Sequence, residues 1–256
     1  MHIVTVVRLV PDLLEEIQVN EQGTDIDREW IGVKLCEFDD HALEQAVLIK
    51  EASGGATVTA VGIAVEGMDR VLQSAVARGA DRVVKIDCGE ANPDSRALAK
   101  LLSEALPQLK PDLILAGVQT PEDLFGQLVP FLGALMGRPH ASGVTGAQVD
   151  GNAVVIQQEY GAGRAARLKL ALPAVLGVQS ASQPPRYVSG TKLRQAIQGT
   201  KIETLSLAAS GAGSGTIKEM RRPARGQGAE MIEGEAEQVA SKIYDALASR
   251  GLLGGK

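Results

Sequence analysis

The strongest constraint on the fold is the regular alternation of two kinds of segment over the first 137 residues. Short runs rich in Val, Ile, Leu and Ala, typical of buried strands, occupy residues 2–10, 56–64, 82–86 and 112–117. Between them, apolar residues recur at the spacing of one face of an amphipathic helix. Strands that alternate with helices build parallel sheets. We therefore predict an α/β fold with a doubly wound, mostly parallel sheet.

The expected helices carry recognisable signals at their ends. Asp39 lies in the first turn of the first helix, where an acidic side chain is favourable. Gly54 and Gly79 lie where the first and second helices should end. These signals predict helices that start and stop close to the limits of the apolar pattern.

The stretch AGVQTPEDLFGQLVP, residues 116–130, follows the fourth expected strand. In α/β proteins a ligand commonly binds where loops follow such strands. Thr120, Pro121 and Asp123 match the N-cap, N1 and N3 positions of a helix. We therefore expect a helix that begins near Thr120 and runs to about Gly137.

After residue 137 the sequence no longer alternates between strand-like and helix-like segments. Turn residues at 150–152 and 161–163 predict hairpin strands, and residues 173–179 predict one more core strand. Residues 185–205 show little apolar periodicity and predict a surface segment.

The C-terminal part predicts an arm beyond the main domain. An amphipathic helix is indicated by the apolar face of Val239, Ile243, Ala246 and Leu247. We expect three parts: an α/β nucleotide-binding-like domain (1–207), a flexible linker (208–230), and a helix that packs on a partner subunit (231–256).

Composition and charge exclude several functions. The chain is 45% hydrophobic and 22% charged, as in ordinary globular proteins. Its net charge of −5 gives no footprint for nucleic acid. No apolar run approaches the ~18 residues of a membrane span, and residues 1–12 lack the features of a signal peptide. Cys36 and Cys88 are not in a CxxC pattern, which favours free thiols in a reducing cytoplasm.

Motifs for catalysis are missing from the sequence. There is no GxxxxGK[ST], no GxSxG, and no GxGxxG after the first strand. The isolated histidines predict no metal site, because metal ligands cluster (His2, His41, His140). We predict no catalytic residue, and a binding or carrier subunit rather than a classical enzyme.

Six segments, taken in order, resemble one family. They are MHIVTVVRLVPD, TDIDREWIGVKLCEFDDHALEQAVLIKE, ARGADRVV, KPDLILAGVQTPEDLFGQLVPFLGALMGRPHA, LKLALPAVLGVQSASQPPRY and the C-terminal AEQVASKIYDALASRGLL. Together they are similar to the β subunits of electron transfer flavoproteins. The resemblance implies a fold of the adenine-nucleotide α-hydrolase-like type, with added hairpin strands and a C-terminal arm ending in a helix.

The resemblance also implies a function. Such β subunits pair with a larger α subunit that binds most of an FAD. This flavin carries electrons from acyl-CoA-type or other flavin dehydrogenases to a quinone oxidoreductase. Many members hold a buried AMP in the β subunit, and electron-bifurcating members hold a second FAD there.

The resemblance assigns a set of cofactor-binding positions. It places an aromatic, Phe38, beside the flavin, where a ring edge can pack on the isoalloxazine. The full set is Val6, Cys36, Phe38, Asp39, Ile63, Gly117, Gln119, Asp123, Gly126, Gln127 and Leu128.

Several of these positions depart from the family. Cys36 stands where the family has Asn, and Val118 where it has Lys. Leu128 and Val129 replace Thr and Gly, which should crowd a phosphate near the backbone. Each lost hydrogen bond to a charged phosphate removes about 1.5–3 kcal/mol. We therefore predict that AMP is bound weakly, in an altered form, or not at all.

A partner-docking segment is implied after Pro185, where the family docks its dehydrogenases. Leu193 is the nearest apolar candidate for an anchor, and Lys192 and Arg194 flank it. The basic cluster KEMRRPAR, residues 218–225, is interpreted as a solvated linker rather than a nucleic-acid patch.

Three functions remain open at this point. The first is an electron transfer flavoprotein β subunit that supports FAD held mainly by the α subunit. The second is an electron-bifurcating, NADH-linked version with a second FAD. The third is a stand-alone nucleotide-binding module of the universal-stress-protein kind, although such modules end before the hairpins and the C-terminal arm.

Overall fold

A nine-stranded sheet forms the centre of the protein. The computed structural model describes residues 1–89, 93–207, 217–224, 226 and 228–253. The strand order is β11-β5-β4-β1-β6-β10-β7-β8-β9. The parallel part comprises β1 (His2–Val6), β4 (Thr57–Ile63), β5 (Arg82–Asp87), β6 (Leu113–Gly117), β10 (Ala174–Val178) and β11 (Glu203–Ser206). The predicted α/β fold with a mostly parallel sheet is confirmed.

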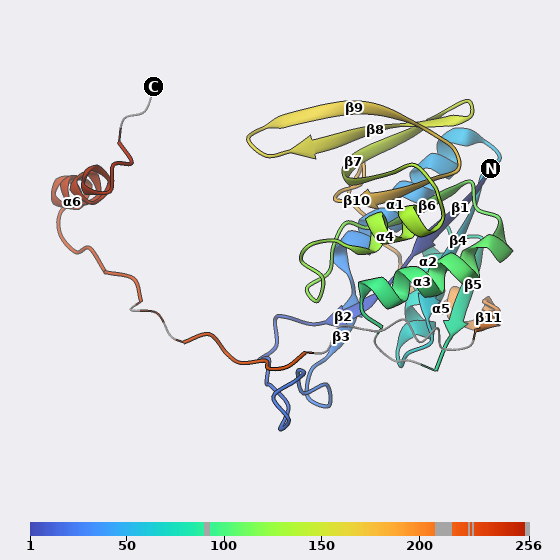
Figure 1. Ribbon diagram of the computed structural model, residues 1–256, viewed down its shortest axis with the longest axis horizontal. Helices are drawn as coiled ribbons and strands as arrows, with labels where there is room; N and C mark the ends of the chain where they lie inside the picture. Colours follow the sequence, from blue (N-terminus) through green and yellow to red (C-terminus); the bar gives the residue numbers. More distant parts are fainter. Residues whose placement is uncertain (90–92, 208–216, 225, 227, 254–256) are drawn as a thin grey trace.

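The far side of the sheet is an antiparallel extension. β7 (His140–Asp150) runs parallel to β10, and β8 (Ala153–Tyr160) and β9 (Arg164–Ala171) follow it as hairpins. These hairpins turn where the glycine-containing turns predicted them. Figure 1 shows the long β8–β9 pair projecting beyond the helical layers.

Helices cover both faces of the parallel strands (Figure 1). α1 (Glu37–Ser53) and α2 (Met68–Arg78) pack on one face with Ile3, Val58 and Leu115. α3 (Ser95–Ala105), its short continuation η1 (Leu106–Leu109) and α4 (Leu128–Leu135) pack on the other with Val4 and Ile114. Neighbouring residues of one strand therefore face opposite layers, which explains why these strands read as continuous apolar runs.

Two of the predicted helix ends are confirmed. α1 ends at Gly54, whose φ of 64° lies in the left-handed region. α2 ends at Gly79, whose N–H bonds to the last carbonyls of the helix.

The helix predicted from Thr120 is wrong in its start. α4 begins at Leu128, and residues 118–127 form a loop. Thr120 caps a turn instead, because the N–H of Asp123 donates to its carbonyl at 3.0 Å and to its Oγ1 at 3.1 Å. Gly126 has a φ of 63°, which stops any helix that starts earlier.

The segment after residue 185 is more ordered than its sequence indicates. Residues Gly190–Gly199 form α5, which lies against α2, and β11 extends the sheet beyond β5. Most of this segment is exposed, as expected of a surface segment, but it contains a helix and a strand that its sequence did not reveal. α5 buries only Ala196, so its apolar pattern is too thin to stand out.

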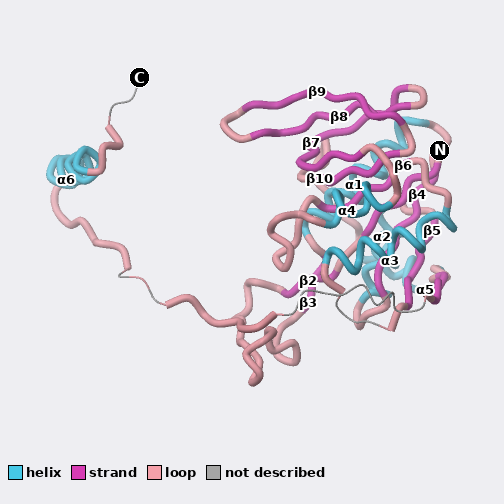
Figure 2. The backbone as a smooth tube through the Cα atoms, in the orientation of Figure 1, coloured by secondary structure: helices cyan, strands magenta, loops and turns pink. Residues whose placement is uncertain are grey.

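The first predicted strand is split in two. The chain leaves β1 after Val6 and forms β2 (Leu9–Pro11), which pairs with β3 (Val33–Leu35) in a separate ribbon. Residues 12–32 make an excursion beyond this ribbon, seen as loops in Figure 2.

The C-terminal segment leaves the main body (Figure 1). It contacts the excursion, where the N–H of Met220 donates to the carbonyl of Gly23 at 2.6 Å. It ends in α6 (Ala236–Ser249), which buries none of its residues. Residues 208–216 of the predicted linker lie outside the described residues, and the division into three parts stays a prediction. Within the described ranges, no helix has the length and apolarity needed to cross a membrane.

Candidate functional site

The predicted cofactor residues meet at the carboxyl edge of the sheet. β1 lies between β4 and β6, and the chain crosses from one side of β1 to the other between β5 and β6. The crevice between the ends of β1 and β6 is therefore the topological switch point, where open α/β sheets bind ligands. Val6, Ile63 and Gly117 are the last residues of β1, β4 and β6.

Asp39, in the first turn of α1, ties this edge together. It is fully buried. Its Oδ1 accepts from the Gly117 N–H at 2.6 Å and from Arg8 Nη2 at 2.8 Å. Its Oδ2 accepts from Arg8 Nε at 2.8 Å and from the Arg8 N–H at 2.9 Å. Four bonds fill the acceptor sites of one carboxylate, so Asp39 organises the site and has no acceptor left for a cofactor.

Arg8 is the other half of this pair, and the sequence analysis overlooked it. Its Nη2 also donates to the carbonyl of Gly117 at 3.0 Å. Burial lowers the pKa of Arg8, but the Asp39 carboxylate outweighs this effect and leaves the pKa raised. A charged side chain directly after an apolar strand is the signal that could have identified it.

Gly117 is where the strand and the helix approach most closely. A Cβ atom at this position would lie 2.6 Å from both Asp39 Oδ1 and the Cβ of Phe38. Real Cβ atoms do not come so close, so the first turn of α1 can dock on β6 only over a glycine. Phe38 itself is half-buried.

Cys36 caps α1 and is closed off from solvent. Its side chain is buried, and its thiol donates to the carbonyl of Gln119 at 3.5 Å. Burial, followed by the nearby Asp39 carboxylate, raises the pKa of the Cys36 thiol to about 11. The thiol is therefore protonated at neutral pH and joins α1 to the loop that follows β6.

This pKa gives a prediction for stability in alkali. The unfolded thiol ionises near its ordinary value of 9.0 and the folded thiol only near 11. The unfolded chain thus loses the proton first, and folding stability falls as the pH rises through this window. Between pH 8 and 10 the wild type should lose about 1 kcal/mol more than Cys36→Ala does. Urea unfolding at both pH values measures this, and equal losses in the two proteins would contradict it.

The loop at 118–127 is held by hydrogen bonds and one ion pair. Asp123 Oδ2 accepts from Ser95 Oγ at 2.5 Å and from the Gln127 N–H at 2.7 Å. Arg28 Nη2 donates to Glu122 Oε1 at 2.7 Å and so ties the loop to the excursion. Asp123 thus acts inside the protein, at the start of α4.

The predicted crowding by Leu128 and Val129 is not found. Both side chains are buried in the core beneath α4, with 1% and 0% exposure, and they face away from the loop surface. What the loop lacks is a cation, because Val118 stands beside Gly117. The Asp123 carboxylate also occupies the helix end that would attract a phosphate.

Three polar groups at this edge are left for a ligand. Gln119 is half-buried and Gln127 is exposed, and neither side chain is bonded to a described residue. Arg8 Nη1 likewise has no bond within the described residues. Amide groups and a guanidinium N–H group can hydrogen-bond to the polar edge of a flavin. In the described part of the chain, no three His, Cys, Asp or Glu side chains gather as a metal site would require.

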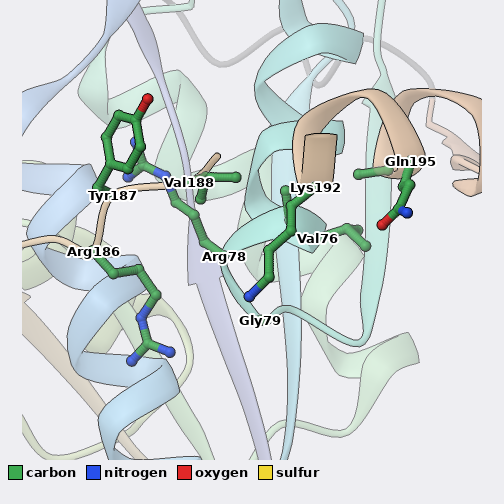
Figure 3. Close-up of a pocket in the computed structure, with 10 residues that line it drawn as sticks. Val76, Arg78, Gly79, Arg186, Tyr187, Val188, Lys192 and Gln195 are labelled. Carbon is green, nitrogen blue, oxygen red and sulfur yellow. The ribbon is translucent and has the colours of Figure 1, made fainter. Parts of the chain in front are cut away.

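The predicted docking residues lie on α5, apart from the switch point. Lys192 lines a hollow of about 390 Å³ between α2 and α5, together with Arg78, Arg186 and Tyr187. Figure 3 shows its ammonium group pointing toward Gly79. Arg194 is exposed, whereas Leu193 is half-buried and does not project freely. This hollow is on a helical face, so it is a separate feature from the crevice.

Arg186, which lines this hollow, is held in place by two carboxylates of α1. It donates to Glu44 Oε1 at 2.8 Å and to Glu51 Oε1 at 2.7 Å, both on α1. Glu44 is buried, and the pair of carboxylates raises the pKa of Arg186. The PRY stretch therefore serves to clamp the chain onto α1.

Comparison with known proteins gives one consistent result. Residues 26–224 match the electron transfer flavoprotein domain. The chain is 30% identical to the electron transfer flavoprotein subunit beta of Methylophilus methylotrophus, over 96% of this chain and 98% of that one. It is 26% identical to the subunit beta of Bacillus subtilis, over 93% and 91%. It is 24% identical to that of Clostridium acetobutylicum, over 96% and 98%.

The match therefore spans the sheet, the excursion, the switch-point loop and the C-terminal arm. The aligned region covers 98% of the length of both the Methylophilus and the Clostridium subunit. The chain belongs to the electron transfer flavoprotein family, as a β subunit.

Proposed function

We propose that this chain pairs with an α subunit and supports an FAD held mainly by that partner. The heterodimer passes electrons from flavin dehydrogenases of the acyl-CoA type, or similar donors, to a quinone-linked acceptor. The observation that carries this proposal is the similarity to β subunits over 96% of the chain. The crevice at the end of β1 and β6 supports it, because that edge is where a shared cofactor would reach this fold.

The residues at the crevice suit a supporting role. When bound, FAD supplies reversible one-electron chemistry. Phe38 offers a half-buried ring edge against which a flavin can pack. Gln119, Gln127 and Arg8 Nη1 offer hydrogen bonds. Asp39 and Arg8 hold the strand ends and the loop in place, so these groups are positioned before the cofactor arrives.

The nucleotide site within this chain is proposed to bind AMP weakly or not at all. Val118 provides no cation, and Cys36 already donates its S–H to Gln119. Asp123 places a negative charge at the start of α4, where a phosphate would bind. Adenosine lacks this charge and should be less affected.

The proposal also covers the docking of the electron donor, the contact of the C-terminal helix with the α subunit, and the compartment. The α5 surface with Lys192, Leu193 and Arg194 is proposed to dock the electron donor. The amphipathic α6, which buries nothing in this chain, is proposed to pack on the α subunit. The compartment is proposed to be the cytoplasm.

Flavin content tests the proposal directly. The chain is co-expressed with the electron transfer flavoprotein α subunit of its own organism, and the nucleotides released on denaturation are quantified by mass spectrometry. We expect a yellow heterodimer with one FAD and less than one AMP, and a colourless chain when it is expressed alone. Two FAD molecules would favour an electron-bifurcating subunit. A heterodimer without flavin would overturn the proposal, and an ATP-binding monomer would revive the stand-alone module.

A further inference from the structure

The two ends of α5 are held to the rest of the protein in different ways. The chain that follows α5 enters β11, which pairs with β5 along its whole length. The chain that precedes α5, residues 181–186, lies in no helix or strand. α5 itself buries only Ala196, and a hollow of about 390 Å³ lies between it and α2. Packing therefore restrains the start of α5 weakly, and the contacts of residues 181–186 are its main support.

One face of α1 holds residues 181–186. The Ala181 N–H donates to His41 Nδ1 at 3.3 Å, and the Ser182 N–H donates to Gln45 Oε1 at 3.0 Å. His41 and Gln45 are four positions apart, so they lie on the same side of the helix. Side chains of α1 thus take the place of a neighbouring strand for the backbone of this segment.

Glu44, on this part of α1, makes the strongest of these contacts. It is buried, with 4% exposure. Its Oε2 accepts from the Arg186 backbone N–H and from Arg186 Nε, both at 3.0 Å, and its Oε1 accepts from Arg186 Nη2 at 2.8 Å. Hydrogen bonds between a carboxylate and a guanidinium are about twice as strong as neutral ones. Glu44 therefore fixes both the backbone and the side chain of Arg186.

Arg186 serves two carboxylates at once. Its Nη1 donates to Glu51 Oε1 at 2.7 Å and its Nη2 to Glu51 Oε2 at 3.1 Å. The side chain of Glu51 is 54% exposed, and an exposed ion pair contributes little, whereas breaking a buried pair is strongly destabilising. Glu44 is thus the dominant partner. The planar guanidinium, with its forked donors, is what allows one side chain to bond both carboxylates.

We propose that Glu44 and Arg186 are positioning residues for the electron donor, because they fix the start of α5 in the orientation that the donor recognises. The side chains that they place are those of Lys192, Leu193 and Arg194. This inference rests on the proposed function, in which the α5 surface docks the donor. Arg186 acts through the position of α5 and not through its own charge, which the two carboxylates of α1 already engage.

Hydrogen exchange in the full-length chain tests whether the pair holds α5. Glu44→Gln keeps the shape of the side chain and removes its charge. We expect the α5 amides of this variant to exchange at least about tenfold faster than in the wild type. The amides of β11 should keep their wild-type rates, because their bonds to β5 are untouched. Unchanged exchange in α5 would overturn the proposal.

Steady-state kinetics test whether the position of α5 matters to the donor. The heterodimer with the α subunit is the substrate, and an acyl-CoA dehydrogenase of the same organism reduces it. We expect Glu44→Gln and Arg186→Met to raise the KM for the heterodimer about tenfold. The kcat and the flavin content should stay within about twofold of wild type, a split that a general loss of stability does not produce. A wild-type KM for Glu44→Gln would overturn the proposal.

Asp150→Asn is the matched control for the loss of one carboxylate. Asp150 pairs with Lys169 at 2.7 Å on the hairpins, and the side chain of Asp150 is 63% exposed. This pair contacts neither α1 nor α5. The control should leave both the exchange of α5 and the KM at their wild-type values.

The direction of the change in KM separates positioning from simple attraction. If the charge of Arg186 attracted an acidic donor, Glu44→Gln would lower the KM, because it removes a negative charge beside Arg186. Arg186→Lys would then keep the wild-type KM. If Arg186 positions α5, both variants raise the KM, since a lysine ammonium lacks the fork that bonds two carboxylates. A lowered KM for Glu44→Gln, or a wild-type KM for Arg186→Lys, would overturn the proposal.

The wild type keeps this test distinct from that of the proposed function. A wild-type heterodimer that no flavin dehydrogenase of its organism reduces would end the proposed donor role, and with it the role of the pair in docking. A wild-type heterodimer that is reduced, with a KM that Glu44→Gln and Arg186→Met leave unchanged, would end only the present inference.

Discussion

An Asp39→Asn variant is expected to lose about 3–5 kcal/mol of its free energy of unfolding. The substitution leaves the shape of the side chain but removes its charge and turns one acceptor into a donor. Arg8 would then be a buried guanidinium without a counter-charge, and one of the N–H groups now bonded to the carboxylate would lose its partner. Proteins of this kind are stable by only about 5–15 kcal/mol, so much of the total is at stake.

Urea unfolding followed by circular dichroism measures this loss. Glu37→Gln is the matched control, because Glu37 lies in the same first turn of α1 but is 83% exposed at its side chain. The control should change stability by less than about 0.5 kcal/mol. A loss below about 1 kcal/mol for Asp39→Asn would show that the four short contacts contribute little.

A Gly126→Ala variant is expected to be destabilised by about 3 kcal/mol, with the damage centred on the switch-point loop. Two costs combine at this position. A left-handed φ of 63° is unfavourable for alanine by about 1–2 kcal/mol. The new Cβ would also fall against the carbonyl oxygen of Val118, which is backbone and cannot turn aside.

A second glycine separates these two costs. Gly54 has nearly the same φ, 64°, but nothing lies within 4 Å of an added Cβ. Gly54→Ala therefore carries the conformational cost alone, and the difference between the two variants measures crowding in the loop. If both variants lost the same free energy of unfolding in urea, the loop would have to move without cost to accommodate the new Cβ. That result would contradict the view that the loop is rigid before a cofactor binds.

The sequence predicted which helices and strands form better than it predicted the residues at which they begin and end. Strand and helix periodicity identified the parallel core, and turn residues located both hairpins, because these signals are local. The boundary of α4 was missed since Thr120 and Asp123 satisfy a capping pattern locally, while Gly126 decides the outcome. The residues near position 120 do not by themselves indicate whether the capping pattern or the glycine determines where the helix begins.

The contacts within the candidate site were harder to predict than the helix boundaries, because they join residues that are far apart in the sequence. The resemblance named Cys36, Asp39, Gly117 and Gln119 as cofactor-binding positions, and the structure brings them together at one edge of the sheet. Asp39 is bonded to residues 31 and 78 positions away in the chain. No periodic pattern relates such positions, so the hydrogen bonds of Asp39 could not be predicted from the sequence, and its place beside a cofactor stays a prediction.

The exposure of Trp30 has a practical consequence for experiments on this protein. It is the single tryptophan, and it is already 77% exposed in the folded chain. Its emission should therefore shift little when the protein unfolds, which makes it a poor probe of folding. The same exposure makes it a built-in, label-free reporter of anything that covers the excursion before β3.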